Sequence, residues 1–222
     1  MRLYLSSYRI GDRAGSLLAL LGSGKRTAII SNALDNISAT ARAIYRDEVH
    51  DPHVELRSLG LETEELDLRR YFGNPGGLQA ALGAFDLVWV MGGNAFVLRR
   101  AMKQSGFDDV IVDMLDRDEI VYGGFSAGAV VAAPTLRGID LMDDPTEVPA
   151  GYEAEPTWDG LGLIDYSIVP HFRSPHPETE AAERALRHMC NRGMRYRALR
   201  DGEVIVWTET RTIAADTLLR IA

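Results

Sequence analysis

Short apolar runs alternate along the chain with segments whose apolar residues recur at helical spacing. The apolar runs predict strands at residues 3–7, 27–31, 61–68, 85–91, 119–122 and 166–170. The helical spacing predicts helices at residues 14–21, 37–50, 77–82, 95–103, 108–115 and 178–191. Because strands that alternate with helices are typical of a mostly parallel sheet covered on both faces, we predict an α/β fold of this kind.

Two regions depart from the alternation. Residues 134–158 carry four prolines and several acids without periodicity, which predicts a long loop, and such loops are often functional. Beyond the last predicted helix, the runs 196–199, 204–208, 212–214 and 218–221 predict short antiparallel strands with turns such as Asp201-Gly202. Since no repeat or linker marks a boundary, we expect one α/β domain over residues 1–222.

Composition narrows the class of protein. The chain has 222 residues, and its formal net charge of -8 argues against a nucleic-acid partner. No apolar run approaches the roughly 20 residues that a membrane span needs, and the first residues are too polar for a signal peptide. The single cysteine, Cys190, excludes an internal disulfide. We therefore expect a soluble cytoplasmic protein, either a monomer or a homodimer.

The segment Gly124-Phe-Ser126-Ala-Gly128 is the strongest chemical signal. It matches the nucleophile elbow G-x-S-x-G, and it stands between a predicted strand and small residues that can open a helix. A serine so placed lies above the end of the sheet with its hydroxyl exposed to substrate. Ser126 is therefore the candidate nucleophile.

A serine hydroxyl needs a base to remove its proton, and the base needs a carboxylate behind it. Among five histidines, only His171 directly follows an apolar strand, so it is the candidate base. Asp140, Asp143 and Asp144 lie between serine and histidine in the chain, and any of them is a candidate for the carboxylate. Backbone N–H groups would hold the oxyanion, with Ala127 and Gly93 as candidates because Gly92-Gly93 also follows a predicted strand.

Several of these segments together resemble peptidase E, the α-aspartyl dipeptidases, which are grouped with the cyanophycinases. The marks are Val90-Met-Gly-Gly-Asn94, the Gly-Phe-Ser-Ala-Gly-Ala run at 124–129, Pro134-Thr-Leu-Arg137 and the Pro-His-Phe run ending at Phe172. The resemblance covers nearly the whole chain. It implies a fold related to class I glutamine amidotransferases, with serine in place of their cysteine, and a serine peptidase that cleaves after an N-terminal aspartate.

The resemblance also implies roles for particular residues. Ser126 and His171 match the family's nucleophile and base, and Gly93 and Ala127 match its oxyanion positions. Asp140 is the nearest match for the carboxylate, with Asp143 and Asp144 as alternatives, and Glu153 or Glu155 would qualify if a glutamate is used, as in some relatives. No metal or other cofactor is implied.

Binding an aspartyl substrate calls for cations near the nucleophile. Arg173 and Arg137 are candidates because a guanidinium suits a carboxylate, and Asn94 is a further candidate for substrate binding. The substrate's α-amine would need an acid or a carbonyl, for which the 140–155 loop is a candidate. The expected partner is thus a small peptide with N-terminal Asp.

Three other functions remain open from the sequence. A cyanophycinase-like exopeptidase would share the elbow, although Phe125 stands where a smaller polar residue is expected. An esterase of the α/β-hydrolase type would share the order Ser, Asp, His, but no His-Gly-Gly oxyanion segment is present. A binding protein could also keep the elbow without an active triad.

Overall fold

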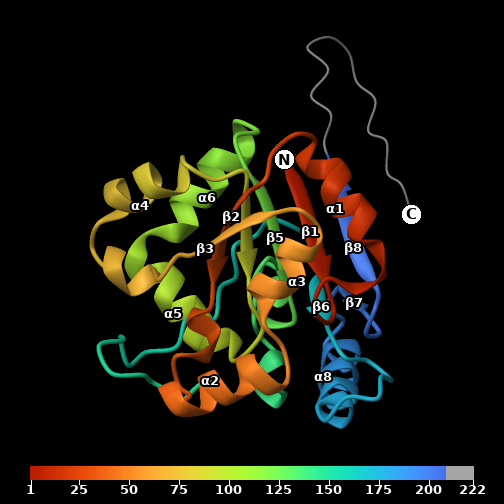
Figure 1. Ribbon diagram of the computed structural model, residues 1–222. Helices are drawn as coiled ribbons and strands as arrows, with labels where there is room; N and C mark the ends of the chain where they lie inside the picture. The colour runs from red at the N-terminus through yellow and green to blue at the C-terminus, as the bar shows by residue number, and fades with distance from the viewer. Residues whose placement is uncertain (209–222) are drawn as a thin grey trace, which may run out of the picture.

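The computed structural model describes residues 1–208, and a mostly parallel sheet forms their centre (Figure 1). The strands are β1 (Arg2–Ser6), β2 (Arg26–Ile30), β3 (Glu62–Glu65), β4 (Leu87–Val90), β5 (Val121–Phe125), β6 (Ser167–Val169), β7 (Tyr196–Ala198) and β8 (Val204–Thr208). Within the described chain, the main sheet has the order β3-β2-β4-β5-β1-β8, and β6 and β7 form a second sheet. All pairs in the main sheet are parallel except that of β1 with β8.

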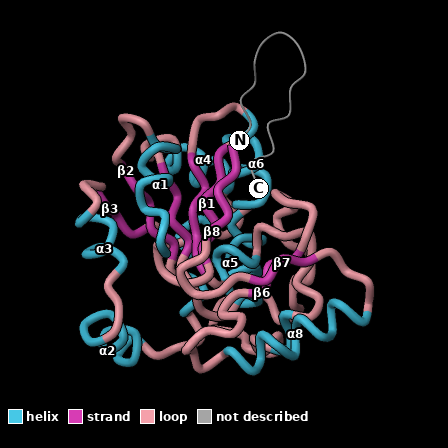
Figure 2. The backbone as a smooth tube through the Cα atoms, turned by 90° about the vertical axis from the view of Figure 1, so that its right-hand side faces the viewer, coloured by secondary structure: helices cyan, strands magenta, loops and turns pink. Residues whose placement is uncertain are grey.

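Helices cover both faces of the main sheet. They are α1 (Ala14–Leu21), α2 (Ala39–Glu48), α3 (Pro52–Ser58), α4 (Pro75–Leu82), α5 (Ala95–Ser105), α6 (Phe107–Asp116), α7 (Ala127–Val130) and α8 (Thr179–Asn191), with short 3₁₀ turns at Gly11–Arg13, Asn32–Leu34, Leu68–Tyr71 and Ile139–Leu141. Figure 2 shows α1 and α3 on one side of the sheet and α5 and α6 on the other. None of these described helices is long and apolar enough to cross a membrane.

The strand residues explain why both faces need a cover. Successive side chains of a strand point to opposite faces, and all four residues of β4 are buried. Trp89 packs in one apolar cluster with Leu17 of α1 and Leu56 of α3. Val88 and Val90 pack in the other cluster, which holds the apolar residues of α4, α5 and α6. The predicted α/β fold is therefore confirmed.

Two details differ from the sequence prediction. Residues 52–58, for which the sequence predicted no helix or strand, form α3, since Asp51 caps its first N–H groups and Pro52 stands in its first turn. β7 pairs in parallel with β6, whereas all C-terminal strands were expected to be antiparallel. β8 is antiparallel as predicted. The strands predicted at 212–214 and 218–221 lie outside the described residues.

The strand order brings three chain segments to one edge of the sheet. β4, β5 and β1 are neighbours and parallel, so their carboxyl ends lie together. The predicted long loop also reaches this region, where the Asn94 side chain donates to the Asp144 carbonyl. Further along α5, the buried Arg100 donates hydrogen bonds to the carbonyls of Pro145, Glu153 and Ala154. The carboxyl edge, where open α/β sheets place their ligands, is thus where a site is expected.

Candidate active site

Ser126 stands at a sharp turn between β5 and α7. Its φ of 47° and ψ of -117° are unusual for a residue with a side chain, and strain of this kind marks a nucleophile elbow. Its N–H points back to the β1 end, 3.2 Å from the carbonyl oxygens of both Ser6 and Ser7. The turn therefore holds the Ser126 side chain at the carboxyl edge of the sheet.

Gly128 makes this turn possible. A Cβ at this position would lie 2.2 Å from the carbonyl oxygen of Val90 in the neighbouring strand. A Cβ on Gly124 would lie 2.9 Å from the Gly128 carbonyl oxygen. Since real Cβ contacts are longer than this, both glycines of the motif are needed for the close approach of α7 to the sheet.

His171 approaches the serine from the end of β6. Its Nε2 lies 3.0 Å from Ser126 Oγ, within hydrogen-bond distance. The imidazole is 2% exposed, and its backbone N–H donates to Ser7 Oγ at 2.9 Å. The structure thus joins the predicted nucleophile and the predicted base.

The carboxylate behind His171 is Asp201. Its Oδ1 lies 2.8 Å from His171 Nδ1. An ionised carboxylate can only accept hydrogen bonds, so this contact assigns the proton to Nδ1 and leaves the Nε2 lone pair free for the serine proton. Ser126, His171 and Asp201 form a chain of hydrogen bonds with the connectivity of a catalytic triad.

The prediction that Asp140, Asp143 or Asp144 supplies this carboxylate is wrong. Each accepts a hydrogen bond from a backbone N–H elsewhere: Asp140 from Gly138, Asp143 from Ala95 and Asp144 from Thr146. Asp140 and Asp144 hold local turns of the long loop, and Asp143 binds the start of α5, so the described contacts of these acids are not with His171. Their place in the chain between serine and histidine is not matched by a place beside His171 in the fold.

Asp201 reaches the histidine because its turn is fastened from two sides. Its N–H donates to Ser174 Oγ at 2.8 Å, and the Ser7 hydroxyl donates to its Oδ1 at 3.0 Å. Ser7 is fully buried and is not among the site residues predicted from the sequence. Its position directly after β1 was a usable signal, because the ends of parallel strands supply site residues.

Two backbone N–H groups flank Ser126. Ala127 is the first residue of α7, and Gly92 packs so closely that a Cβ on it would lie 3.1 Å from Ser126 Cβ. Within residues 1–208, neither the Ala127 nor the Gly93 N–H has a hydrogen-bond acceptor. Gly93 has a φ of 135°, and a Cβ there would meet the Ala33 carbonyl at 2.6 Å. Both groups suit the predicted oxyanion role, which stays a prediction.

Aromatic and acidic side chains line the histidine. The His176 ring stacks on His171 with centroids 3.7 Å apart, and Tyr8 packs edge-on against both rings. Burial lowers the pKa of His176, as does the neighbouring His171. Glu178 Oε2 lies 3.8 Å from His171 Nε2. This wall holds the imidazole in one orientation.

Asp143 is a second acid near this wall. Burial raises the pKa of its carboxyl to about 7, while the Ala95 N–H lowers it and the negative charge of Glu178 raises it. Because Asp143 binds the N–H at the start of α5, it also fixes the end of the Gly92-Gly93 segment.

The structure does not bring the predicted substrate-binding residues into contact with Ser126 or His171. The guanidinium of Arg137 lies over the Trp158 ring, and that of Arg173 lies over Phe172 and 3.9 Å from Glu183. The Asn94 side chain accepts hydrogen bonds from the Phe96 and Val97 N–H groups in the first turn of α5 and donates one to the Asp144 carbonyl. Arginine recognition of an aspartyl side chain therefore stays a prediction.

One group of side chains in the described chain has the composition of a metal site. The ligand atoms of His171, His176 and Glu178 lie within 4.8 Å of one another. However, the two rings are parallel to within 7°, and imidazole lone pairs lie in the ring plane, so they do not converge on one ion. This arrangement fits stacking better than coordination, and metal independence stays a prediction.

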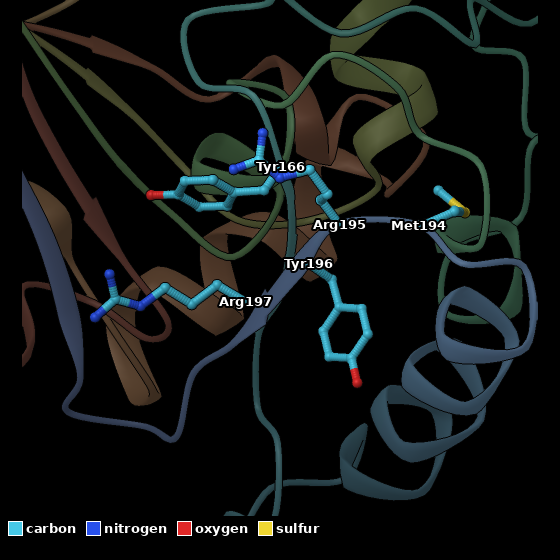
Figure 3. Close-up of a pocket in the computed structure, with 5 residues that line it drawn as sticks. All are labelled: Tyr166, Met194, Arg195, Tyr196 and Arg197. Carbon is cyan, nitrogen blue, oxygen red and sulfur yellow. The ribbon is translucent and has the colours of Figure 1, made fainter.

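A surface depression lies elsewhere on the molecule. Figure 3 shows its lining, which comprises Tyr166, Met194, Arg195, Tyr196 and Arg197. These residues lie at the amino ends of β6 and β7, whereas His171 follows the carboxyl end of β6. The depression is therefore separate from the serine and histidine.

A serine elbow at the carboxyl edge of a parallel sheet, with a histidine and a carboxylate behind it, is an arrangement that defines a serine hydrolase of the α/β class, here with the chain order Ser, His, Asp. The sequence model of peptidase family S51 matches residues 27–214, and the chain belongs to this family. The predicted resemblance to the peptidase E group is thereby confirmed.

Individual relatives agree with this assignment. An uncharacterized peptidase of Listeria monocytogenes is 34% identical over 119 residues, which are 54% of this chain and 55% of that protein. Peptidase E of Streptomyces coelicolor is 31% identical over 163 residues, which are 73% of this chain and 57% of that protein. The match therefore spans little more than half the length of these curated relatives.

Solved structures share the fold. A crystal structure of a candidate peptidase E protein from Listeria monocytogenes EGD-e has a TM-score of 0.68 and 25% identity, covering 94% of this chain and 98% of that one. The crystal structure of a peptidase from an acI-B1 actinobacterium has a TM-score of 0.63 at 14% identity, covering 93% and 82%.

Proposed function

We propose that this protein is a serine peptidase that hydrolyses the bond after an N-terminal aspartate in dipeptides or short peptides. The observation that carries the chemistry is the chain of two short contacts, 3.0 Å from Ser126 Oγ to His171 Nε2 and 2.8 Å from Nδ1 to Asp201. The aspartyl preference rests on membership of family S51 and on relatives named peptidase E.

The contacts support the following course of reaction. Ser126 Oγ attacks the first peptide carbonyl while His171 Nε2 takes its proton. Asp201 stabilises the resulting imidazolium, and the N–H groups of Ala127 and Gly93 hold the oxyanion. The imidazolium then gives its proton to the leaving amine. Water attacks the aspartyl ester on Ser126 with His171 as base, and aspartate is released.

The reaction is tested with a chromogenic aspartyl anilide in the presence of a chelator. Ser126→Ala is expected to lower kcat by a factor on the order of 10⁶, the loss seen when a serine peptidase loses its nucleophile. Turnover by the variant within tenfold of the wild-type rate would exclude the mechanism. A wild-type rate that the chelator abolishes would contradict the metal-free course.

A fluorophosphonate probe gives a second readout that does not depend on the substrate. The probe reacts with an activated serine, so we expect it to label Ser126 in the wild-type protein and to leave Ser126→Ala unlabelled. An unlabelled wild-type protein would favour the binding-protein alternative. Labelling without turnover of the aspartyl anilide would keep the serine hydrolase and reject the aspartyl preference.

A further inference from the structure

Glu178 is an acid beside the reacting atoms that the catalytic steps above do not use. Its Oε2 lies 3.8 Å from His171 Nε2, the nitrogen that faces Ser126 Oγ at 3.0 Å. The carboxylate therefore stands on the side of the imidazole where the substrate must lie. Its side chain is 44% exposed, in contrast to the 2% of His171, so it is open to a ligand.

The local structure holds Glu178 in this place. It is the residue before α8, but its side chain does not cap the helix. Its N–H instead donates to His176 Nδ1 at 3.2 Å, and His176 stacks on His171. Within residues 1–208, no lysine or arginine forms an ion pair with Glu178. The structure thus presents a carboxylate without a cationic partner next to the nucleophile, on a backbone position that the bond to His176 holds.

A second acid lies close enough to interact with Glu178. The Glu178 charge contributes to the raised pKa of Asp143, which lies near the start of α5. Two neighbouring carboxyl groups without a cation between them favour a ligand that brings a positive charge. The free α-ammonium of a peptide is such a group.

The distances fit an ammonium on the first residue of a substrate. That nitrogen is two bonds away from the scissile carbonyl carbon, which a nucleophile approaches at about 3–3.5 Å. An ammonium hydrogen bond to a carboxylate adds about 2.7–2.9 Å. The receptor must therefore lie within a few ångströms of Ser126 Oγ. Glu178 meets this requirement, because Glu178 Oε2 and Ser126 Oγ lie 3.8 Å and 3.0 Å from the same atom, His171 Nε2.

We propose that Glu178 binds the free α-ammonium group of the substrate and so limits cleavage to the first peptide bond. This proposal rests on the proposed peptidase function. It moves the amine receptor from the 140–155 loop, where the sequence suggested it, to the residue before α8. An acetylated or internal amide nitrogen carries no positive charge, so it would bind the Glu178 carboxylate more weakly than an ammonium does.

The test compares Glu178→Gln with Glu180→Gln, a matched control that removes the same charge from an exposed position in α8. Each protein is assayed on an aspartyl anilide with a free amine and on its N-acetyl derivative. We expect the Glu178 variant to lose about tenfold in kcat/KM on the free amine, mainly through KM, because a charged hydrogen bond is lost. Loss of the Glu178 charge next to the His171 imidazolium acts equally on both substrates, so we expect the free-amine substrate to lose about tenfold more than the acetylated one, and the control to match the wild type.

The ratio of the two substrates separates amine binding from an effect on His171. An equal loss on both substrates, or an unchanged ratio, would overturn the proposal. Fluorophosphonate labelling of Ser126 and the melting temperature show that the variant is folded and competent. A wild-type protein that labels but prefers the acetylated substrate would also overturn this proposal while leaving the serine hydrolase intact. A wild-type protein that neither labels nor turns over would instead reject the proposed function.

Discussion

Replacing Asp201 by Asn removes the charge behind the histidine and changes little else in shape. The Asn carbonyl can still accept from Ser7 Oγ and from His171 Nδ1, so the ring can keep its place. What disappears is the negative charge that stabilises the imidazolium in the transition state. The substitution therefore separates electrostatic stabilisation from packing.

The size of the effect follows from the separation of the charges. Asp201 Oδ1 lies 2.8 Å from Nδ1, and the two side chains are 18% and 2% exposed, so solvent screens the pair weakly. Two unit charges about 4 Å apart at an effective dielectric constant of about 20 interact by about 4 kcal/mol. Since 1.36 kcal/mol is a factor of ten in rate, we expect a loss of about 10³ in kcat with a small change in KM.

The assay uses the labelling rate of Ser126 by a fluorophosphonate together with kcat on the aspartyl anilide. Both should fall in Asp201→Asn. Asp143→Asn and Asp144→Asn, at the positions that the sequence suggested, should stay within a few-fold of wild type. A full rate in Asp201→Asn together with a large loss in Asp143→Asn would refute the assignment of Asp201.

Two further substitutions test the surroundings of the triad. Ser7→Ala removes the hydroxyl that joins the His171 N–H to Asp201. We therefore expect a loss of about 1–3 kcal/mol in unfolding free energy and a slower labelling of Ser126. Unchanged values of both quantities would contradict the positioning role of Ser7. Asp143 has a pKa raised from 3.8 to about 7, so the folded state binds more protons than the unfolded state between these values, and stability falls as the pH rises through this window. The unfolding free energy of Asp143→Asn should therefore exceed that of the wild type by a margin that grows from pH 5 to pH 8 and reaches up to a few kcal/mol, with a higher melting temperature. Asp140→Asn, at an exposed position, should show no such trend.

The sheet and its helices could be predicted because burial on two faces leaves a plain pattern. The helix at Ala14–Leu21 has the predicted bounds, and β4 falls within its predicted apolar run, all four of its residues being buried. The helix Pro52–Ser58 was missed because it is short and polar, with Pro52 and Leu56 as its buried residues. Its Asp51-Pro52 start was nevertheless a readable signal.

The serine and the histidine could be predicted because each follows a strand and has a motif around it. Asp201 could not be chosen in this way. It lies in a turn between two strands whose partners are set by tertiary pairing, and a turn containing Asp-Gly is also what a plain hairpin would show. Asp140, Asp143 and Asp144 were candidates because of their order in the chain, but chain order does not show which strands pair in the folded sheet.

The pairing of the last two strands explains why the acid follows the histidine in the chain. β7 runs parallel to β6, so the Leu199 N–H reaches the Val169 carbonyl and the chain leaves at the same end as His171. β8 then returns antiparallel to β1, with Val204 beside Ser6, and the Ser7 N–H donates to the Glu203 carbonyl. The turn between them must therefore lie where β1 and β6 both end, and Asp201 is the turn residue that faces His171. Because backbone bonds to both sheets fix the turn, the carboxylate has its place before any substrate binds.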